Sequence, residues 1–215
     1  YKGTFVITVP TAAAALMNHT IDADISTLKN IFCGSAPMPT KLFEKFQKET
    51  GVSIIEGYGM TEATCLVSCN PPDGERKIGS VGLPLPFTEV RVLEISRKDE
   101  VLKECKDGEP GEVCVYNPGI NIGFTYTDPI KNKSLFIEDK FLRTGDIGYL
   151  DVDGYLWLTG RAKDVIMRGG HNIDPLIIEE ALSGHPSVSL VGAIGQPDIY
   201  SGELPCAYVE LISGS

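Results

Sequence analysis

The sequence predicts a mixed α/β (α+β) fold in three parts. Strand-like and helix-like segments alternate early in the chain, which favours a parallel-sheet α/β subdomain over residues 1–78. Short strand-like runs separated by Gly, Pro and Asp clusters follow, and they favour a small distorted β-barrel subdomain over residues 79–160. The alternation then returns over residues 161–215, which indicates a third unit of α+β type.

The first part contains three expected strands and two expected helices. β-branched and aromatic residues predict a strand over Thr4–Thr8, and a proline then opens an alanine-rich helix over Pro10–Met17. A short apolar run predicts a buried strand over Asn30–Cys33. The next helix, Thr40–Glu49, places its apolar residues on one face and ends before a glycine, after which Val52–Ile55 resumes strand character.

The middle part reads as strands and turns with few helical periods. The expected strands include Glu89–Ile95, Gly111–Tyr116 and Tyr155–Thr159. Asp151–Gly154 is expected to form a hairpin turn, and its two aspartates imitate the start of a calcium loop. The bidentate glutamate that such a loop needs at its twelfth position is replaced by Ala162, so the pattern does not predict calcium.

The last part is expected to contain a strand, a helix and two more strands. Asp174 and Pro175 give an N-cap residue followed by proline at the first helical position, and the helix should run to Ser183. The expected strands are Asp164–Met167, Val188–Ile194 and Cys206–Ile212.

Composition and charge exclude several classes of protein. The chain has 215 residues, 42% of them hydrophobic and 22% charged, which is ordinary globular usage rather than that of a disordered or fibrous protein. A net charge of −10 argues against a nucleic-acid partner, but backbone N–H groups can still bind a small anionic ligand. The longest apolar stretch, Phe5–Met17, is too short to span a bilayer, and no secretory signal is visible, so a cytoplasmic location is expected.

Cysteine and histidine spacing does not predict a metal centre. The six cysteines form no CxxC pair, which is typical of reduced thiols in a cytosolic protein. The three histidines have no metal-ligand spacing among themselves or with the cysteines, so the pattern does not predict zinc.

Two candidate ligand-binding motifs lie in the first part. The turn Gly34–Pro37 contains small residues after a strand, so a ligand could approach its backbone closely, although most such turns serve packing. The segment Gly57–Glu62 follows Val52–Ile55, at the strand end where open α/β sheets place ligands. Its two glycines are expected to clear space around an aromatic ring. Thr61 offers a hydroxyl to a phosphate, and Glu62 offers a hard oxygen ligand for magnesium. Singly, these residues also fit a turn tyrosine, an N-cap threonine and a solvated glutamate.

Two further motifs carry charge. In Thr144–Asp146 a carboxylate follows glycine, and a carboxylate can accept hydrogen bonds from both ribose hydroxyls of a nucleotide. Gly160–Asp164 joins the second and third parts, and Arg161 could reach ribose or phosphate oxygens. Alone, the first motif also fits a surface turn and the second a solvated linker.

Taken together and in this order, the motifs resemble those of the adenylate-forming (AMP-binding) superfamily, which includes acyl-CoA synthetases, peptide-synthetase adenylation domains and firefly luciferase. Gly34–Pro37 matches the Gly-Gly-Ala-Pro-like turn, and Tyr58–Glu62 matches the Tyr-Gly-x-Thr-Glu motif. Arg143–Asp146 matches the Thr-Gly-Asp motif, and Gly160–Asp164 matches the hinge signature, with Gly169, Gly170, Ile173, Asp174, Pro175, Glu179 and Glu180 behind it.

The resemblance implies roles for these residues and for ATP, AMP, Mg²⁺ and coenzyme A as cofactors. Adenine would lie between the backbone of residues 35–37 and the ring of Tyr58. Thr61 would hold the phosphate, and Glu62 would hold the magnesium. Asp146 and Arg161 would hold the ribose, with Leu158 near the base. Lys163 falls on the hinge position, about which the small C-terminal domain of such enzymes swings between adenylation and thioester formation. Residues 161–215 would then be the hinge and a partial α+β C-terminal domain. The implied catalytic set is Thr61, Glu62 and Lys163, and the implied nucleotide and CoA set is Gly34, Ser35, Ala36, Pro37, Gly57, Tyr58, Gly59, Met60, Asp146, Leu158, Arg161 and Gly170.

Residues flanking the motifs fall where members of the superfamily line an acyl pocket. These residues are Cys33, Gly57 and Cys65. His171–Asn172 departs from the common hinge pattern, so no CoA contact is expected there. The resemblance does not identify the carboxylic acid.

Two parts of the superfamily pattern have no match in these 215 residues. One is an upstream Ser/Thr/Gly-rich phosphate loop, and the other is a C-terminal lysine in a Pro-x-x-x-Gly-Lys context. The chain is therefore interpreted as a segment of a longer ATP-dependent acyl-CoA synthetase of fatty acid metabolism, an acid–thiol ligase, inactive and prone to self-associate when alone. Two alternatives stay open: an adenylation domain that loads a carrier protein, and a noncatalytic adenylate-binding module.

Overall fold

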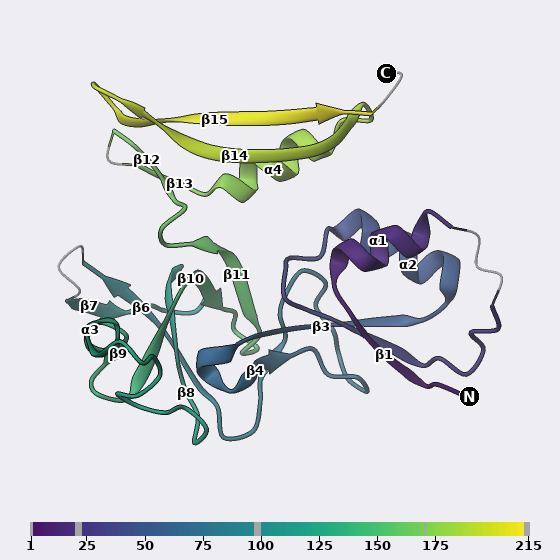
Figure 1. Ribbon diagram of the computed structural model, residues 1–215, viewed down its shortest axis with the longest axis horizontal. Helices are drawn as coiled ribbons and strands as arrows, with labels where there is room; N and C mark the ends of the chain where they lie inside the picture. Colours follow the sequence, from purple (N-terminus) through teal and green to yellow (C-terminus); the bar gives the residue numbers. More distant parts are fainter. Residues whose placement is uncertain (1, 20–22, 97–99, 170, 213–215) are drawn as a thin grey trace. The chain divides into compact units, whose positions relative to one another are not determined.

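The computed structural model describes residues 2–19, 23–96, 100–169 and 171–212 (Figure 1). The chain divides into two compact units, and each is described by itself. Unit 1 comprises Tyr1–Thr144 and Tyr149–Trp157, and unit 2 comprises Gly145–Gly148 and Leu158–Ser215. The three-part division at residues 78 and 160 stays a prediction.

The first sheet of unit 1 changes from parallel to antiparallel along its width. Its strands pair in chain order, as β1 (Phe5–Thr8), β2 (Asn30–Cys33), β3 (Ser53–Met60), β4 (Cys65–Cys69) and β5 (Leu83–Pro84). β1, β2 and β3 are parallel, with Ile31 opposite Ile54, whereas β4 and β5 are antiparallel additions. The parallel sheet expected from the sequence is therefore confirmed for the first three strands.

Helices α1 (Pro10–Met17) and α2 (Thr40–Thr50) form where the sequence predicts them and cover one face of these strands (Figure 1). Gly51 ends α2 in the left-handed conformation, with φ of 70°, and its N–H group donates to the carbonyl of Gln47. That conformation is costly for a residue with a Cβ atom, which explains the glycine at this position.

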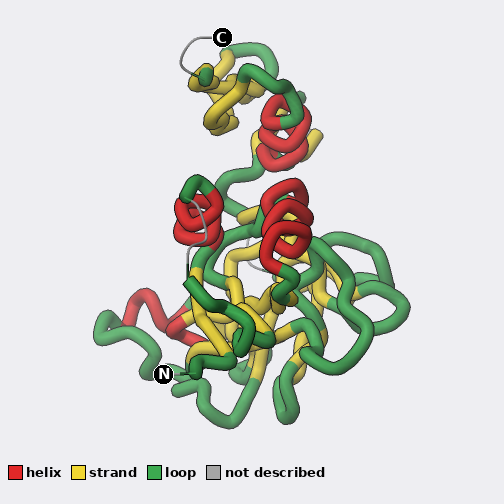
Figure 2. Tube along the Cα trace, turned by 90° about the vertical axis from the view of Figure 1, so that its right-hand side faces the viewer, coloured by secondary structure: helices red, strands yellow, loops and turns green. Residues whose placement is uncertain are grey.

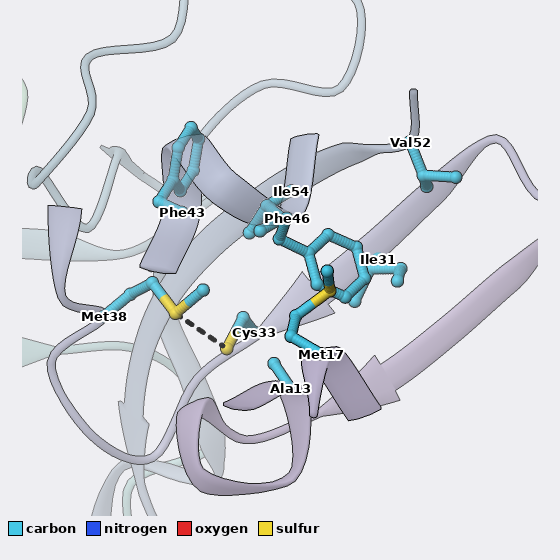
Figure 3. Packing of buried hydrophobic residues seen from close by; sticks show 9 residues of the cluster. All are labelled: Ala13, Met17, Ile31, Cys33, Met38, Phe43, Phe46, Val52 and Ile54. Carbon is cyan, nitrogen blue, oxygen red and sulfur yellow. Dashed lines mark hydrogen bonds between the residues drawn. The ribbon is translucent and has the colours of Figure 1, made fainter. Parts of the chain in front are cut away.

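The core of this layer is apolar and draws on both helices and two strands (Figure 3). Its buried members are Ala13, Met17, Ile31, Cys33, Met38, Phe43, Phe46, Val52 and Ile54. Each large side chain stabilises the fold by roughly 1.5–3 kcal/mol when buried. The sulfur atoms of Cys33 and Met38 lie 3.9 Å apart, and burial raises the pKa of the Cys33 thiol to about 11.

The second sheet comes from the middle of the chain. Its strand order is β11-β10-β8-β6-β7, with β9 paired to β10. The bounds are β6 (Glu89–Ile95), β7 (Val101–Glu104), β8 (Gly111–Tyr116), β9 (Phe136–Ile137), β10 (Phe141–Leu150) and β11 (Leu156–Arg161), and the short helix α3 (Pro129–Lys133) precedes β9.

The mixed α/β fold class is confirmed, with one difference in this sheet. The expected barrel would need its edge strands to pair, and within the described ranges β7 and β11 do not pair, so the sheet is open. β7 has four residues, all exposed, and two of them, Lys103 and Glu104, are charged. A short strand with charged side chains is typical of a sheet edge that is exposed to solvent.

The hairpin turn expected at Asp151–Gly154 is present, and a lysine neutralises its aspartates. Asp151 N–H bonds the carbonyl of Tyr155, and Gly154 N–H bonds the carbonyl of Asp151. Lys77 Nζ lies 2.7 Å from Asp151 Oδ2 and 2.5 Å from Asp153 Oδ2. Burial opposes ionisation of Asp151, but hydrogen bonds from Lys77 and Trp157 outweigh it and hold the pKa of Asp151 well below its usual range.

Unit 2 contains an antiparallel sheet and one helix. The sheet has the order β13-β12-β15-β14, from β12 (Ile166–Arg168), β13 (His171–Ile173), β14 (Val188–Asp198) and β15 (Gly202–Leu211). Helix α4 (Pro175–Ser183) lies along β14 (Figures 1 and 2), and Glu179 Oε1 accepts the Ala193 N–H at 2.8 Å. The predicted N-cap is confirmed, since the Asp174 side chain accepts from Leu176 N–H.

Across the described part of the chain, the helices are all too short or too polar to cross a bilayer.

Candidate functional site

The turn after β2 lies against β3. A Cβ atom placed on Gly34 would lie 3.2 Å from the carbonyl oxygen of Gly57 and 3.1 Å from the ring of Phe32. Ser35 has φ of 69°, so the turn uses a left-handed residue beside its glycine. The exposed part of the turn comprises Ser35, Ala36 and Pro37. The structure therefore brings two predicted motifs together, the turn and the Gly57 end of the second motif.

Most of the second motif belongs to a strand rather than to a loop. β3 pairs in parallel with β2 up to Glu56 and then runs antiparallel to β4, with Tyr58 opposite Ser68 and Met60 opposite Cys65. The tyrosine side chain is 9% exposed. The sequence prediction of a strand ending at residue 55 is therefore five residues short.

The protein's own atoms approach both glycines of this motif closely, and the aromatic ring beside Gly57 is that of Phe32. A Cβ atom on Gly57 would lie 2.6 Å from the ring of Phe32, and one on Gly59 would lie 1.7 Å from the carbonyl oxygen of Cys65. Both positions require glycine because a neighbouring ring and a neighbouring strand approach the backbone there.

Thr61 and Glu62 lie in a one-turn 3₁₀ segment, Thr61–Ala63, between β3 and β4. They line a hollow of about 320 Å³ within unit 1, together with residues of the loop before α3, among them Asn121, Thr125 and Tyr126. The hydroxyl of Tyr126 donates to Glu62 Oε1 at 2.5 Å. The hollow thus presents a hydroxyl and a carboxylate side by side, which suits a phosphate with its metal ion.

A buried glutamate precedes the motif and was not singled out from the sequence. Glu56 is 7% exposed, and its Oε2 atom accepts the Gly79 N–H at 3.2 Å. Burial raises the pKa of this carboxyl to about 7, although the Gly79 hydrogen bond works in the opposite direction. The one sequence signal that could have identified Glu56 is its position as an acidic residue directly after the predicted strand Val52–Ile55.

In unit 2 the predicted ribose residues come together. Asp146 is 8% exposed and follows Gly145, whose φ is 72°. Arg161 Nε lies 3.2 Å from Asp146 Oδ1, and Ala162 N–H donates to the Gly145 carbonyl at 2.9 Å. A guanidinium thus holds a buried carboxylate, while the arginine itself is largely exposed.

The other predicted residues have varied surroundings. Leu158 is half-buried in β11, and Lys163 is exposed in the turn between β11 and β12. Gly170 lies outside the described residues. Cys33 packs in the apolar core and Cys65 is exposed, so the acyl-pocket role of both stays a prediction.

The fold of the two units and the motifs that they carry are those of adenylate-forming enzymes. The chain superposes on the crystal structure of ATP-bound MatB from Rhodopseudomonas palustris with a TM-score of 0.90 and 33% identity, covering 99% of this chain and 42% of that chain. It also superposes on O-succinylbenzoate coenzyme A synthetase (MenE) from Bacillus subtilis, in complex with ATP and magnesium ion, with a TM-score of 0.81 and 32% identity, over 98% of this chain and 42% of that chain.

Sequence comparison names the family. The AMP-binding enzyme family matches residues 1–125, and the chain belongs to this family. It is 45% identical over 216 residues to the marinolic acid–CoA ligase of Pseudoalteromonas sp. (strain SANK 73390). This alignment covers all of this chain and 33% of the ligase, so the chain spans about a third of that relative's length.

Proposed function

We propose that the whole protein containing these 215 residues is an ATP-dependent acyl-CoA synthetase, an acid–thiol ligase. A carboxylate oxygen of the acid attacks the α-phosphorus of ATP, and the bond from this phosphorus to the oxygen of the β-phosphate breaks. Pyrophosphate departs, and an acyl-adenylate is formed. The thiol of CoA then attacks the acyl carbon, its proton is lost, and AMP departs.

The observation that carries this proposal is the polar hollow of unit 1. Thr61 and Glu62 lie side by side on its wall, and both belong to the segment that resembles the Tyr-Gly-x-Thr-Glu motif of the superfamily. The threonine hydroxyl donates to phosphate oxygens, and the carboxylate is an acceptor-only group suited to a hard cation. In the proposed reaction these two residues orient the triphosphate for the attack.

The residues fit magnesium. Mg²⁺ is usually bound by one or two carboxylates together with substrate phosphates, and Glu62 supplies such a carboxylate at the hollow. When bound, the ion neutralises charge on the triphosphate oxygens and supports departure of pyrophosphate. The complex of the related MenE enzyme with ATP and magnesium ion supports magnesium as the cation.

Asp146 and Arg161 supply the proposed ribose contacts. The ion pair fixes one carboxylate oxygen, and a carboxylate has acceptor capacity for two ribose hydroxyls in addition. Because Asp146 is buried, hydrogen bonds to its charge are worth more than at the surface.

The acid is proposed from the relatives and not from the pocket. The similarity to a marinolic acid–CoA ligase supports a carboxylic acid as substrate and CoA as acceptor. A role in fatty acid metabolism is part of the proposal, and the similarity to a long-chain-fatty-acid–CoA ligase supports it. The cytoplasmic location stays a prediction.

The test is a product analysis of the whole protein. The purified enzyme is given ATP, Mg²⁺, CoA and a panel of carboxylic acids of increasing chain length, and AMP, pyrophosphate and acyl-CoA are quantified. We expect the three products in equal amounts, each dependent on every substrate. Acyl transfer to a carrier-protein phosphopantetheine arm but not to CoA would favour a carrier-loading enzyme, and nucleotide binding without pyrophosphate release would favour a noncatalytic module.

A further inference from the structure

Glu62 has a hydrogen-bond donor from a distant part of the chain. Tyr126 lies 64 residues later, and its hydroxyl donates to Glu62 Oε1. A carboxylate is an acceptor-only group and a phenol O–H is a donor, so the direction of this hydrogen bond is fixed.

The backbone of Tyr126 is itself fixed in place. Asn132 Oδ1 accepts the N–H of Tyr126 at 2.9 Å, and Asn132 Nδ2 donates to the carbonyl of the same residue at 2.8 Å. Asn132 belongs to α3, whose first turn is capped by Asp128 through the N–H of Ile130. The Asn132 side chain thus pairs with both the N–H and the carbonyl of Tyr126, as the backbone of a neighbouring β-strand would.

The segment that carries Glu62 is tied to the same loop at two more points. Thr64 Oγ1 donates to the carbonyl of Gly119 at 2.6 Å, and Asn117 Nδ2 donates to the carbonyl of Ala63 at 2.9 Å. A Cβ atom on Gly119 would lie 2.8 Å from Thr64 Oγ1, so the close approach requires glycine. The loop before α3 therefore contacts the Glu62 carboxylate and the two residues that follow it.

We propose that Tyr126 is a positioning residue that holds the Glu62 carboxylate for the metal–nucleotide complex. The inference rests on the proposed function, in which Glu62 is the magnesium ligand. A carboxylate has about four lone-pair sites, so one hydroxyl donor orients it and leaves acceptor capacity for a cation. Hydrogen bonds of this kind to metal-binding carboxylates fix their direction, and losing one typically costs 10–100-fold in metal affinity or activity.

The test compares Tyr126→Phe, Glu62→Gln and the double variant in the whole protein. Tyr126→Phe removes one oxygen atom and keeps the ring. Mn²⁺ binding, followed by electron paramagnetic resonance in the presence of a non-hydrolysable ATP analogue, gives a readout that does not depend on turnover. We expect about a tenfold weaker Mn²⁺ affinity in Tyr126→Phe, the lower end of that range, because Tyr126 is partly exposed. The magnesium concentration for half-maximal activity should rise in parallel, while the KM for the acid changes little.

The double variant and a remote control separate positioning from general damage. Tyr126→Phe should have no further effect in the Glu62→Gln background, because the hydroxyl acts through the carboxylate. Tyr200→Phe, at a side chain that is 96% exposed, should match wild type. Thermal unfolding of each variant checks the fold, and Asn132→Ala, which loosens the Tyr126 backbone, should also weaken Mn²⁺ binding.

Each contrary result has a distinct meaning. If Glu62→Gln leaves Mn²⁺ affinity unchanged, the magnesium assignment itself is wrong and the proposed function loses that part. If Glu62→Gln weakens Mn²⁺ binding and Tyr126→Phe does not, the positioning role alone is overturned. Tighter Mn²⁺ binding in Tyr126→Phe would also overturn it, since the hydroxyl would then compete with the cation.

Discussion

At the scale of single residues, two buried carboxylates have different partners. Asp146 is paired with the Arg161 guanidinium, whereas Glu56 accepts one backbone N–H from Gly79. The guanidinium orients the Asp146 carboxylate, which is therefore suited to accept hydrogen bonds from a ligand. Burial favours the neutral form of an acid and raises the pKa of Glu56 to about 7, so Glu56 is suited to change its charge near neutral pH.

Asp146→Ala should weaken nucleotide binding by the whole protein. Hydrogen bonds to a charged group are worth roughly 1.5–3 kcal/mol, which corresponds to about 10- to 150-fold in affinity. Calorimetric titration with ATP measures the change, and Asp107→Ala, at an exposed position, serves as the control. Equal affinity in wild type and Asp146→Ala would rule out the ribose role.

Glu56 should make the stability of the protein depend on pH. Its pKa of about 7 in the folded state lies above the value of about 4.3 for an unfolded glutamate, so the folded state binds more protons between these two pH values. The stabilisation is complete below the unfolded pKa, is lost as pH rises through the folded pKa, and amounts to roughly 4 kcal/mol.

Glu56→Gln is the matched variant for this effect, because the amide keeps the size of the neutral acid. Thermal unfolding of both proteins between pH 5 and 8 should show that wild type loses stability, relative to the variant, as the pH rises toward 7. A constant difference over that range would show that Glu56 keeps one charge state.

At the scale of elements, the β3–β4 pair depends on one glycine. The carbonyl of Cys65 occupies the place of a Gly59 side chain, and the register shifts between Tyr58 and Gly59. Gly59→Ala must therefore move backbone atoms, and overpacking of this kind costs about 1–3 kcal/mol or more. Gly192→Ala in β14 is the control, since an added Cβ there meets no atom within 4 Å.

Thermal unfolding and magnesium titration of the two alanine variants check this prediction. Gly59→Ala should unfold at a lower temperature and should also require more magnesium, because β3 leads directly into the segment that carries Glu62. Gly192→Ala should be neutral or slightly stabilising, as alanine in a compatible conformation usually is. A Gly59→Ala protein as stable as wild type would contradict the packing argument.

Local sequence signals predicted most elements well. Pro10–Met17 and Asn30–Cys33 match their predicted bounds, and so do Glu89–Ile95 and Gly111–Tyr116. The antiparallel end of β3 was missed because its pairing with β4 depends on a turn with two left-handed residues, Thr64 and Cys65, which single-sequence patterns do not signal. The sequence pattern also did not indicate that the second sheet is open rather than a closed barrel. Closure depends on whether the two edge strands pair with each other, and the pattern within each strand does not determine this.

At the scale of the whole molecule, the site was predicted where motifs are short and contiguous. The Asp146–Arg161 pair came from two motifs of charged residues, and the structure brings both side chains together. The contacts of Glu62 with Tyr126 and of Glu56 with Gly79 were missed because they join residues 64 and 23 positions apart. A loop without periodicity, such as the one before α3, gives no local signal for such contacts.

The turn after β11 links the predicted ribose residues to the rest of unit 2. Asp164 N–H donates to the carbonyl of Arg161 at 3.0 Å, which closes a turn with Ala162 and Lys163 at its centre. The resemblance to adenylate-forming enzymes implies that the C-terminal domain swings about Lys163 between the adenylation and thioester-forming steps. If so, the backbone dihedral angles of this exposed residue must change during each catalytic cycle.

Lys163→Pro should therefore separate the two half-reactions of the whole protein. Proline fixes φ near −65° and restricts the preceding residue, so the turn keeps one arrangement. We expect acyl-adenylate formation, which is measured by ATP–pyrophosphate exchange, to stay close to wild type. Thioester formation should fall at least about tenfold, or about 1.4 kcal/mol in transition-state free energy.

Lys163→Ala removes the charge and leaves φ unrestricted, so an equal loss in that variant would assign the effect to the ammonium group. A parallel decrease of both half-reactions in Lys163→Pro would contradict the hinge role, because a hinge fixed in one pose should support one step and prevent the other.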